Sequence, residues 1–376
     1  MKKSFSLKDS LFNKGKVTYL ANLFSTQDKT FKNKAFVEDV MATMSTLELK
    51  ERIVWIAEVL ENYLPKDFDT ACALIVKSLP EPLDPNKTDN DYGSFIFAPL
   101  GEYVVRNGLK KKHLNTSFNT LYQLTQRFSM EDAMRSFINE YEDETLAMYN
   151  TWVTDANYHV RRLVSESTRP LLPWSKRVGL TVSHPIAFLD KLYADNARFV
   201  TRSVANHLND ISKKDPSLAV DTLTRWKKEG KQEAIEMEWI IRHALRTLIK
   251  QGNKDALLLL GYDSNPKITV EKFSLEKFSK KISPGEVLSF SFTICAEQDT
   301  NLMIDYIIDF VKAKGHTTPK VFKIKKVCMQ KDETIFVTKN HLFVSDATTF
   351  TLYKGVHKLT LQINGKKFYS TNFNIH

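Results

Sequence analysis

The sequence has few cysteines, few glycines and no long hydrophobic run, and each shortage excludes a class of protein. Its three cysteines, Cys72, Cys295 and Cys328, lie far apart and form no CxxC pair, which excludes a disulfide scaffold, a zinc ribbon and a thioredoxin-like redox motif. The 12 glycines include neither a GxGxxG nor a GxxxxGKS/T loop, so nucleotide-driven chemistry is disfavoured. We therefore expect a protein that uses no metal, nucleotide or other cofactor.

Signal-peptide and membrane-span patterns are also missing from the sequence. The first ten residues carry two lysines but no apolar core after them, and the longest apolar stretch, residues 256–260, is far shorter than the ~20 residues of a membrane helix. With 42% hydrophobic and 26% charged residues, the chain has an ordinary globular composition. We expect a reduced, cytoplasmic monomer without a membrane partner.

The net charge of +10 is distributed unevenly along the 376 residues. The first 150 residues hold 19 Lys and Arg against 21 Asp and Glu, whereas residues 151–260 hold 18 against 12 and residues 261–376 hold 17 against 11. The last arginine is Arg246, so every base after residue 260 is a lysine. This change predicts two domains, 1–262 and 263–376, and the positive excess indicates a polyanionic partner.

The first predicted domain has helical periodicity. Apolar residues at three- and four-residue spacing predict helices over residues 46–64, 68–79, 114–128, 130–141 and 231–250. Ser129 and Asp132 have the spacing of a capping box for the fourth of these helices, and Gly252 is expected to end the fifth. Residues 80–93 contain three prolines and are expected to form a loop, and no strand is predicted before residue 260.

In the second predicted domain the apolar period changes to two. Alternation predicts strands over residues 288–294, 359–363 and 369–375, and Asn364-Gly365 is a two-residue hairpin signal between the last two. About 110 residues of short strands match the size of an immunoglobulin-like β-sandwich. The Cys, Trp and Cys core of antibody domains is absent, so only the architecture is expected.

The basic segment of the first domain contains an internal repeat of about 40 residues. Residues 155–164 align with residues 195–204, and a second step reaches residues 240–244. An apolar residue, an arginine and a small apolar residue recur in each copy, and the arginines are Arg162, Arg202 and Arg242. This period is typical of HEAT or armadillo repeats, which stack into a curved solenoid. The predicted fold is therefore multidomain: an all-α HEAT-like repeat solenoid followed by an all-β immunoglobulin-like sandwich.

Two interpretations of the three repeated arginines are open. Equivalent positions of successive repeats lie side by side, so the arginines would form a positive stripe that binds a polyanion backbone in a salt-dependent way. Alternatively, they pair with acids such as Asp155 or Asp195 and hold adjacent repeats together. The segment contains more bases than such a ladder requires.

The link between the first two repeats combines a carboxylate with an aromatic side chain. Two prolines end the helix that begins near Asn157, which places Glu166 at its C-terminal end and Trp174 on a rigid loop. A surface pair of Glu166 with Arg162 and a packing role for Trp174 are the structural alternatives. Asp210 ends the corresponding helix one repeat later and fits a simple helix terminus.

The longest motifs of the chain resemble the AlkC family of alkylpurine DNA glycosylases. They are HVRRLVSESTRPLLPW at residues 159–174, RSVANHLNDISKKDP at 202–216 and RHALRTLIKQGNKDALLLLGY at 242–262, supported by LELKERI at 47–53, LPKDF at 64–68 and FSMEDAMRSFI at 128–138. The resemblance covers essentially the entire chain, because one branch of the family carries a C-terminal immunoglobulin-like domain.

The resemblance implies a base excision repair hydrolase that cleaves the N-glycosidic bond of cationic alkylated bases, notably 3-methyladenine and 3-methylcytosine, in double-stranded DNA without base flipping. Methylation at N3 makes the base positively charged, and the sugar becomes oxocarbenium-like as the bond breaks. A carboxylate can stabilise that cation and orient the attacking water, as in glycoside hydrolysis. An aromatic face beside the cationic lesion adds ~0.5–2 kcal/mol.

The same resemblance implies the roles of individual residues. Glu166 is the first candidate for the catalytic carboxylate and Trp174 for the aromatic wall, with Asp210 and Glu131 as further acids at the lesion. The expected DNA-binding residues are Arg161, Arg162, Arg169, Arg202, His207, Lys213, Arg242 and Arg246. The lysine-rich β domain is expected to clamp the DNA. Ser167, where family members tend to have glycine, and Leu171, where a base is common, depart from the family pattern and affect the expected loop geometry and DNA grip.

The alternative function is a non-enzymatic HEAT-repeat scaffold that binds DNA or an acidic protein. Such a scaffold would need the arginine stripe but neither Glu166 nor Trp174. A relative with shifted lesion preference, for example toward 7-methylguanine, is a further alternative.

Overall fold

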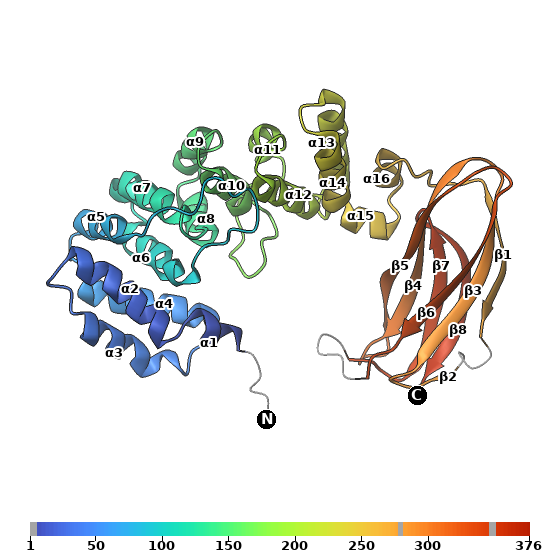
Figure 1. Cartoon of the computed structure of the whole chain (residues 1–376), viewed down its shortest axis with the longest axis horizontal. Coiled ribbons are helices and arrows are strands. Elements are labelled where there is room, and N and C mark those ends of the chain that lie inside the picture. The colour runs from blue at the N-terminus through green and yellow to red at the C-terminus, as the bar shows by residue number, and fades with distance from the viewer. Residues whose placement is uncertain (1–5, 277–280, 346–350) are drawn as a thin grey trace. The chain divides into compact units, whose positions relative to one another are not determined.

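The computed structural model describes residues 6–276, 281–345 and 351–376 (Figure 1). The chain divides into two compact units, Met1–Ala244 and Leu245–His376. The first unit is helical, and the second contains the β-sandwich together with two short helices, α15 (Arg246–Gln251) and α16 (Lys254–Leu259). The division lies upstream of residue 262, at which the composition of the sequence changes. The expected fold class, a helical repeat followed by a β-sandwich, is confirmed.

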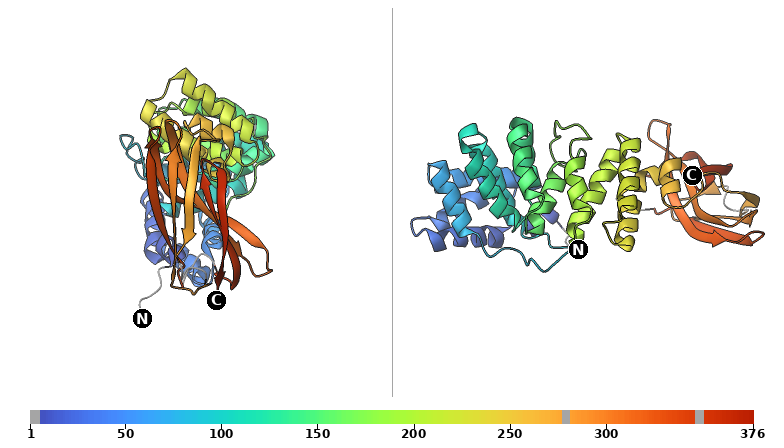
Figure 2. Two further views of the ribbon diagram at one scale, coloured as in Figure 1. Left: turned by 90° about the vertical axis from the view of Figure 1, so that its right-hand side faces the viewer. Right: turned by 90° about the horizontal axis from the view of Figure 1, so that it is seen from above.

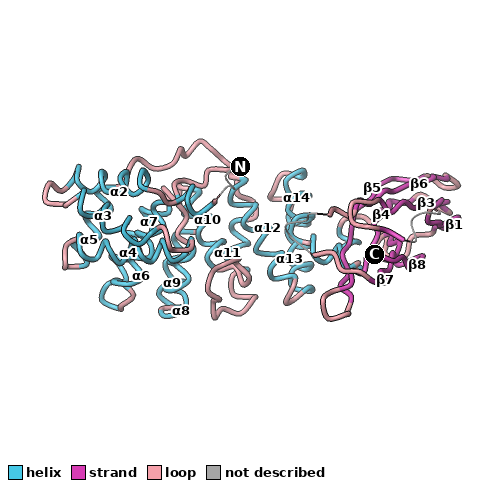
Figure 3. Tube along the Cα trace, turned by 90° about the horizontal axis from the view of Figure 1, so that it is seen from below, coloured by secondary structure: helices cyan, strands magenta, loops and turns pink. Residues whose placement is uncertain are grey.

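The first unit is a curved row of stacked helices, which follow one another side by side in the order of the sequence (Figures 2 and 3). Its helices are α1 (Leu7–Leu11), α2 (Lys14–Gln27), α3 (Asn33–Met44), α4 (Leu49–Tyr63), α5 (Phe68–Ser78), η1 (Phe95–Phe97), α6 (Ala98–Gly108), η2 (Lys111–His113), α7 (Leu114–Thr125), α8 (Glu131–Glu140), α9 (Glu142–Trp152), α10 (Tyr158–Ser167), α11 (Ile186–Leu192), α12 (Arg198–Ser212), α13 (Pro216–Glu229) and α14 (Ala234–Ala244). In Figure 1, α9, α11 and α13 form one layer, and α8, α10, α12 and α14 form the layer beneath it.

The repeat of about 40 residues corresponds to α10, α12 and α14, which pack against one another in that order. Both apolar positions of each copy are buried, namely Val160 and Val164, Val200 and Val204, and Ile240 and Ala244. Residues four apart share one face of a helix, so the arginine between them lies beside this apolar stripe and keeps part of its surface exposed. Neighbouring repeats thus bury a continuous core, as in a solenoid.

The second unit is built on two packed antiparallel sheets. The smaller sheet has the order β1-β3-β6 and the larger the order β2-β8-β7-β4-β5, in which only β2 and β8 pair in parallel. The strands are β1 (Ile268–Leu275), β2 (Lys281–Ile282), β3 (Val287–Ala296), β4 (Thr300–Val311), β5 (Thr317–Met329), β6 (Thr334–Leu342), β7 (Gly355–Ile363) and β8 (Lys366–Ile375). Alternate side chains such as Phe290, Phe292 and Leu361 form the core between the sheets.

The expected hairpin at Asn364-Gly365 joins β7 to β8, and both residues have the positive φ that a two-residue hairpin turn favours, 46° and 76°. Gly365 also meets the end of α15, because a Cβ atom there would lie 2.4 Å from the Cα of Gly252. Gly252 itself ends α15 with a φ of 74°, as predicted. The absence of side chains at both positions therefore lets α15 dock against this turn.

Two expectations about helix boundaries are wrong. The N-cap of α8 is Met130 without a side-chain cap, because the Ser129 hydroxyl accepts a hydrogen bond from Arg162 Nη1 at 2.9 Å instead. The helix expected over residues 231–250 is interrupted, since α14 ends at Ala244 and α15 begins at Arg246. As expected, residues 79–94 connect α5 to η1 without a regular element, and no described residue before β1 belongs to a strand.

Candidate functional site

Glu166 lies in the last turn of α10 and is the centre of a buried cluster of charges. Its Oε1 atom is 2.6 Å from Arg169 Nη1, and its Oε2 atom accepts a hydrogen bond of 2.5 Å from Ser203 Oγ on α12. Arg162 Nη2, one turn earlier on α10, is 3.7 Å from Oε2. The side chain of Glu166 is only 8% exposed, so these partners compensate for the loss of water around the carboxylate. The expected pair with Arg162 is present, but it is buried and not a surface pair.

Arg169 joins a second carboxylate to this cluster. Its Nε and Nη2 atoms each lie 2.9 Å from Asp210 Oδ2 on α12. Lys213 Nζ is 3.2 Å from the other oxygen of Asp210 and remains 39% exposed. Asp210 is buried within α12 and does not end it, because the helix continues to Ser212. Arg169 therefore bridges Glu166 and Asp210, two acids that are predicted to act at the lesion.

Glu131 is the first residue of α8 and interacts electrostatically with both Arg162 and Glu166. Burial raises the pKa of Glu131; Arg162 offsets part of this effect and the negative charge of Glu166 adds to it. Its Oε2 atom is buried and has no hydrogen-bond partner among the residues that the structure describes. A proton acceptor with a raised pKa and an unused oxygen is suited to general-base chemistry.

Burial and neighbouring charges also act on Glu166, but there their net effect lowers the pKa. Burial alone would raise its pKa, but Arg162, Arg169 and the hydrogen bond from Ser203 outweigh burial and hold the pKa below its usual value. Glu166 is therefore ionised at neutral pH. Two neighbouring carboxyl groups whose pKa values are pushed apart are a recurrent arrangement in sites that combine different acid, base and electrostatic roles.

Trp174 lies on the loop between α10 and α11 and is 80% exposed. Its φ of 62° is uncommon for a residue with a large side chain, and its carbonyl accepts a hydrogen bond from Lys50 on α4. A packing role between helices, which was the structural alternative, does not fit this exposure. The indole is available as an exposed aromatic surface.

His207 is fully buried on α12, so the expected direct contact with DNA is wrong for this structure. Burial, assisted by the charge of Arg169, lowers the pKa of His207 to about 3, which keeps the ring neutral at pH 7. Nδ1 lies 3.0 Å from the carbonyl oxygen of Ser165 and donates to it. His207 therefore links α12 to α10 just before Glu166.

The other bases expected to bind DNA differ in their surroundings. Arg202 Nη2 is 2.6 Å from Asp89 Oδ1 on the loop of residues 79–94, and Arg242 Nη1 is 3.1 Å from Glu238 on its own helix. Arg246 is the first residue of α15 and belongs to the second unit. The repeated arginines thus have acidic partners, although not the acids Asp155 and Asp195 that the ladder interpretation names.

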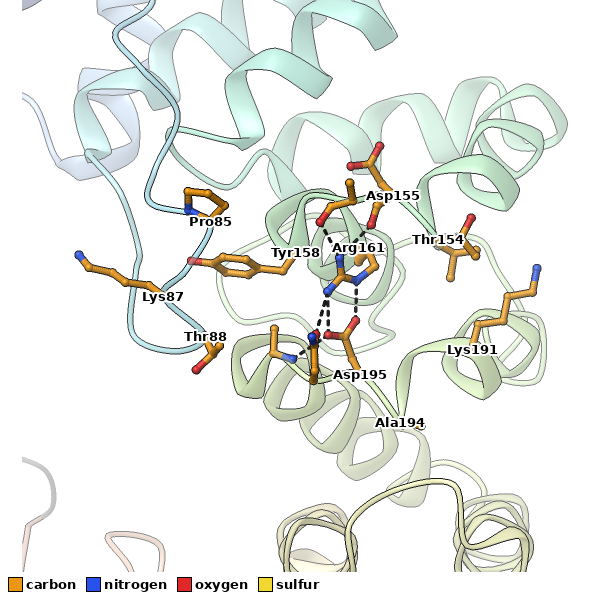
Figure 4. Close-up of a pocket in the computed structure, with 14 residues that line it drawn as sticks. Pro85, Lys87, Thr88, Thr154, Asp155, Tyr158, Arg161, Lys191, Ala194 and Asp195 are labelled. Atoms are coloured by element: carbon orange, nitrogen blue, oxygen red, sulfur yellow. Dashed lines mark hydrogen bonds and ion pairs between the residues drawn. The ribbon is translucent and has the colours of Figure 1, made fainter.

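The ladder contact is made by Arg161 instead, which precedes Glu166 by five residues on α10; Figure 4 shows its bonds to Asp195 and Asp155. Its Nε and Nη2 atoms lie 2.6 and 2.8 Å from the two carboxylate oxygens of Asp195, and Nη1 donates to the backbone carbonyl of Asp155. A cavity of about 520 Å³ opens beside this pair and is also lined by Lys87 and Tyr158. Arg161 lies in the first repeat and Asp195 in the second, so their ion pair holds the two repeats together.

Ser203 and Arg135 were not singled out from the sequence, and Ser129 was expected only as a helix cap, although each contacts this region. Ser129 and Arg135 lie within the FSMEDAMRSFI motif, so that motif was the available signal for both. The described residues contain no group of His, Cys, Asp and Glu side chains arranged to hold a metal ion. None of the described helices has the length and apolarity to cross a membrane.

Comparisons with known proteins agree with the motifs of the chain. Residues 269–376 match the family described as "Uncharacterised protein YhaZ, C-terminal Ig-like domain". The chain is 34% identical over 369 residues to the protein YhaZ of Bacillus subtilis (strain 168), covering 97% of this chain and 98% of that protein. It is also similar to the Pseudomonas fluorescens alkylpurine DNA glycosylase AlkC bound to DNA containing an abasic site analog, with a TM-score of 0.86, 30% identity and coverage of 99% and 100%. The chain therefore belongs to the protein family that includes YhaZ and AlkC.

Proposed function

We propose that the protein is a DNA glycosylase of base excision repair. Its substrates are cationic alkylated bases in duplex DNA, 3-methyladenine and 3-methylcytosine in the first place, and it acts without flipping the base. The observation that carries this proposal is the buried cluster in which Glu166 pairs with Arg162 and Arg169 and interacts electrostatically with Glu131. The similarity of the full chain to AlkC, which was solved with DNA containing an abasic site analog, supports it.

In the proposed reaction the bond between C1′ and the base nitrogen breaks, and its electron pair neutralises the positive charge of the methylated base. The sugar is left as an oxocarbenium-like cation, which the ionised Glu166 stabilises through its negative charge. Water adds to C1′ and loses a proton to a carboxylate, for which Glu131 is suited by its raised pKa. Trp174 faces the cationic base and contributes a cation–π attraction.

Duplex binding is proposed to rely on phosphate contacts. Lys213, Arg202 and Arg242 retain exposed surface and lie on the consecutive repeats α12 and α14. In the second unit, β5 exposes a row of lysines, which are Lys320, Lys323, Lys325 and Lys326. Such bases bind the backbone without reading the sequence, which suits an enzyme whose target is a lesion.

The first test is the release of methylated bases from methylated duplex DNA under single-turnover conditions. Glu166→Gln should lower the rate by a factor of about 10²–10⁴, the usual contribution of such a group. Glu238→Gln is a matched control, because Glu238 is an exposed acid of the same unit that pairs with an arginine. Its rate should equal that of the wild type.

If Glu166→Gln releases bases as fast as the wild type, Glu166 is not the catalytic carboxylate. A wild-type protein that binds duplex DNA but releases no methylated base would instead be the non-enzymatic scaffold. The observation that favours this second candidate is the row of arginines on α10, α12 and α14, since DNA binding alone would need only these.

A further inference from the structure

Arg135 is a fully buried arginine on α8 whose guanidinium the proposed chemistry does not use. Its Nε atom donates to the carbonyl oxygen of Lys176 at 2.7 Å, and Nη1 donates to those of Ser167 and Arg169, both at 2.8 Å. A buried charge is costly unless its donors are used. Nη2 of Arg135 has no hydrogen-bond partner among the described residues, so the three bonds of Nε and Nη1 hold the side chain in place. The acceptors lie on both sides of Trp174 in the sequence. Arg135 therefore joins the end of α10 to the segment that follows Trp174.

The contacts of Arg135 are part of a longer anchoring face on α8. This face consists of Asp132, Arg135, Ser136 and Asn139, whose spacing of three and four residues places them on one side of the helix. Besides Arg135, Asp132 accepts a hydrogen bond from Ser175, Ser136 accepts one of 2.8 Å from Lys176 Nζ, and Asn139 bonds to the carbonyl of Arg177 and the amide of Gly179. The anchoring face thus holds the chain over residues 175–179, directly after Trp174.

The anchoring explains how Trp174 keeps an unfavourable conformation. A positive φ is unfavourable for a residue with a side chain, and an 80% exposed indole gains little from burial. Local packing of the indole therefore does not hold it in place. The backbone is held instead by two hydrogen bonds, one from Lys50 to the carbonyl of Trp174 and one from Arg135 to the carbonyl of Lys176.

We propose that Arg135 is a positioning residue that sets the placement of Trp174 relative to Glu166. Through the carbonyls of Ser167 and Arg169 it fixes the end of the helix that carries the carboxylate, and through the carbonyl of Lys176 it fixes the loop that carries the indole. The guanidinium of Arg135 thereby fixes the position of the Trp174 indole relative to the Glu166 carboxylate. This inference rests on the function proposed above, and Arg135 acts through its neighbours without touching the DNA.

Arg52 provides a matched control for a buried arginine that only supports the fold. It is 2% exposed and lies on α4. Its guanidinium donates to three backbone carbonyls, those of Leu47, Lys8 and Phe12, and it also pairs with the carboxylate of Asp9 at 2.7 Å. Its acceptors all lie within residues 8–47, and none of them is in the segment that carries Glu166 and Trp174. Arg52→Met and Arg135→Met therefore remove the same kind of interaction at two places.

The test measures single-turnover release of 3-methyladenine by the full chain. Arg135→Met should lower the rate by roughly 10–100-fold, because a small misplacement of a catalytic group has effects of this size. Its affinity for undamaged duplex should change less than about twofold, and Arg135→Lys should recover part of the rate. Arg52→Met should reduce thermal stability without a selective loss of rate.

A double-mutant cycle decides whether Arg135 acts through Trp174. In a Trp174→Ala background, Arg135→Met should cost less than about threefold, because the group that it positions is already absent. If Arg135→Met costs the same factor in both backgrounds, the proposal is wrong. Should Arg135→Met not fold, Arg135→Lys takes its place in the same cycle.

A spectroscopic measurement separates this inference from the proposed function. The fluorescence difference between the wild type and Trp174→Phe isolates the signal of Trp174, and its anisotropy should fall in Arg135→Met but not in Arg52→Met. This measurement needs no enzymatic activity. A wild-type protein without activity would therefore overturn the function alone, whereas an unchanged Trp174 anisotropy in Arg135→Met would overturn the positioning role.

Discussion

At the scale of single residues, the site shows how one cation tunes two neighbouring acids. Arg162 lowers the pKa of both Glu131 and Glu166, yet the net shifts are opposite. Glu166 has a second arginine and a hydroxyl donor, so charge and hydrogen bonding exceed the cost of burial. Glu131 has only part of this compensation, so burial prevails. The two acids thereby acquire different protonation behaviour from nearly the same surroundings.

The pH dependence of the reaction should report this tuning. The rate should fall on the acidic side as Glu131 takes up a proton, and the raised pKa places this fall above the usual range of a glutamate. Arg162→Gln removes a cation that lowers the pKa of both acids, so the acidic fall should move to higher pH. The measurement is the single-turnover rate as a function of pH.

Arg242→Gln is the control for this pH profile, because Arg242 is the equivalent arginine two repeats later and pairs with Glu238 outside the site. Its profile should keep the wild-type midpoint even if DNA binding weakens. A wild-type midpoint in Arg162→Gln as well would mean that neither acid controls the rate.

At the scale of elements, the loop of residues 79–94 reaches the helix that carries Ser203 and Asp210. Asp89 pairs with Arg202, Asn90 accepts a hydrogen bond of 3.1 Å from the same arginine, and the carbonyl of Thr88 accepts one of 2.8 Å from the amide of Phe199. The teal segment after α5 in Figure 1 shows this course. The loop therefore occupies Arg202 with a carboxylate and an amide oxygen, and these groups would compete with a DNA phosphate for the arginine.

Replacement of Asp89 should consequently strengthen binding to undamaged duplex. Asp89→Asn frees Arg202 from a partly exposed ion pair, which is worth up to ~1 kcal/mol, so Kd should fall by roughly fivefold at low salt. Binding is measured by fluorescence anisotropy with a labelled duplex.

Asp84→Asn on the same loop is the control, since Asp84 accepts hydrogen bonds from Asn86 within a local turn. It should leave Kd unchanged. Weaker binding by Asp89→Asn would show that Asp89 orients Arg202 for DNA and does not compete with it.

The elements differ in how far local sequence determines them. Helices α4 and α5 follow the expected ranges because their apolar spacing is a local property, and the turn at Asn364-Gly365 follows from two residues that tolerate a positive φ. The break between α14 and α15 has no glycine or proline to signal it. Asp89 and Arg202 are 113 residues apart and bear no repeat relation, so no pattern in the chain announces their contact.

The candidate site was predictable only in part for the same reason. Glu166, Trp174 and Asp210 lie in long motifs and were named from them, and the structure brings Glu166 and Asp210 together through Arg169. Ser203 could not be predicted, because a serine within a helix forms no recognisable sequence motif and its partner Glu166 is 37 residues away. The family resemblance implied that His207 contacts DNA, but its helical position turns the ring inward.

At the scale of the whole molecule, both units contribute to the positive charge, and the binding of duplex DNA should be strongly salt-dependent. The logarithm of the affinity for undamaged duplex should fall linearly with the logarithm of the salt concentration, because bound bases release counterions from the phosphates. Arg202→Ala should reduce the slope by about one, whereas Glu166→Gln should leave it unchanged. A flat response of the wild type would contradict phosphate binding.

The docking of α15 also defines the smallest piece of the second unit that should be produced alone. Met303 and Gln362 are buried although neither belongs to the core between the sheets, and the backbone of Gly252 lies against Gly365 at the same sheet. A recombinant fragment that starts at residue 263 would lack α15 and α16 and the contact they make there. One that starts at Leu245 keeps it. The β-sandwich together with α15 and α16 is thus the part of the chain that should be transferred as one piece. A gene fusion joined at residue 262 would separate α15 from the turn at Gly365.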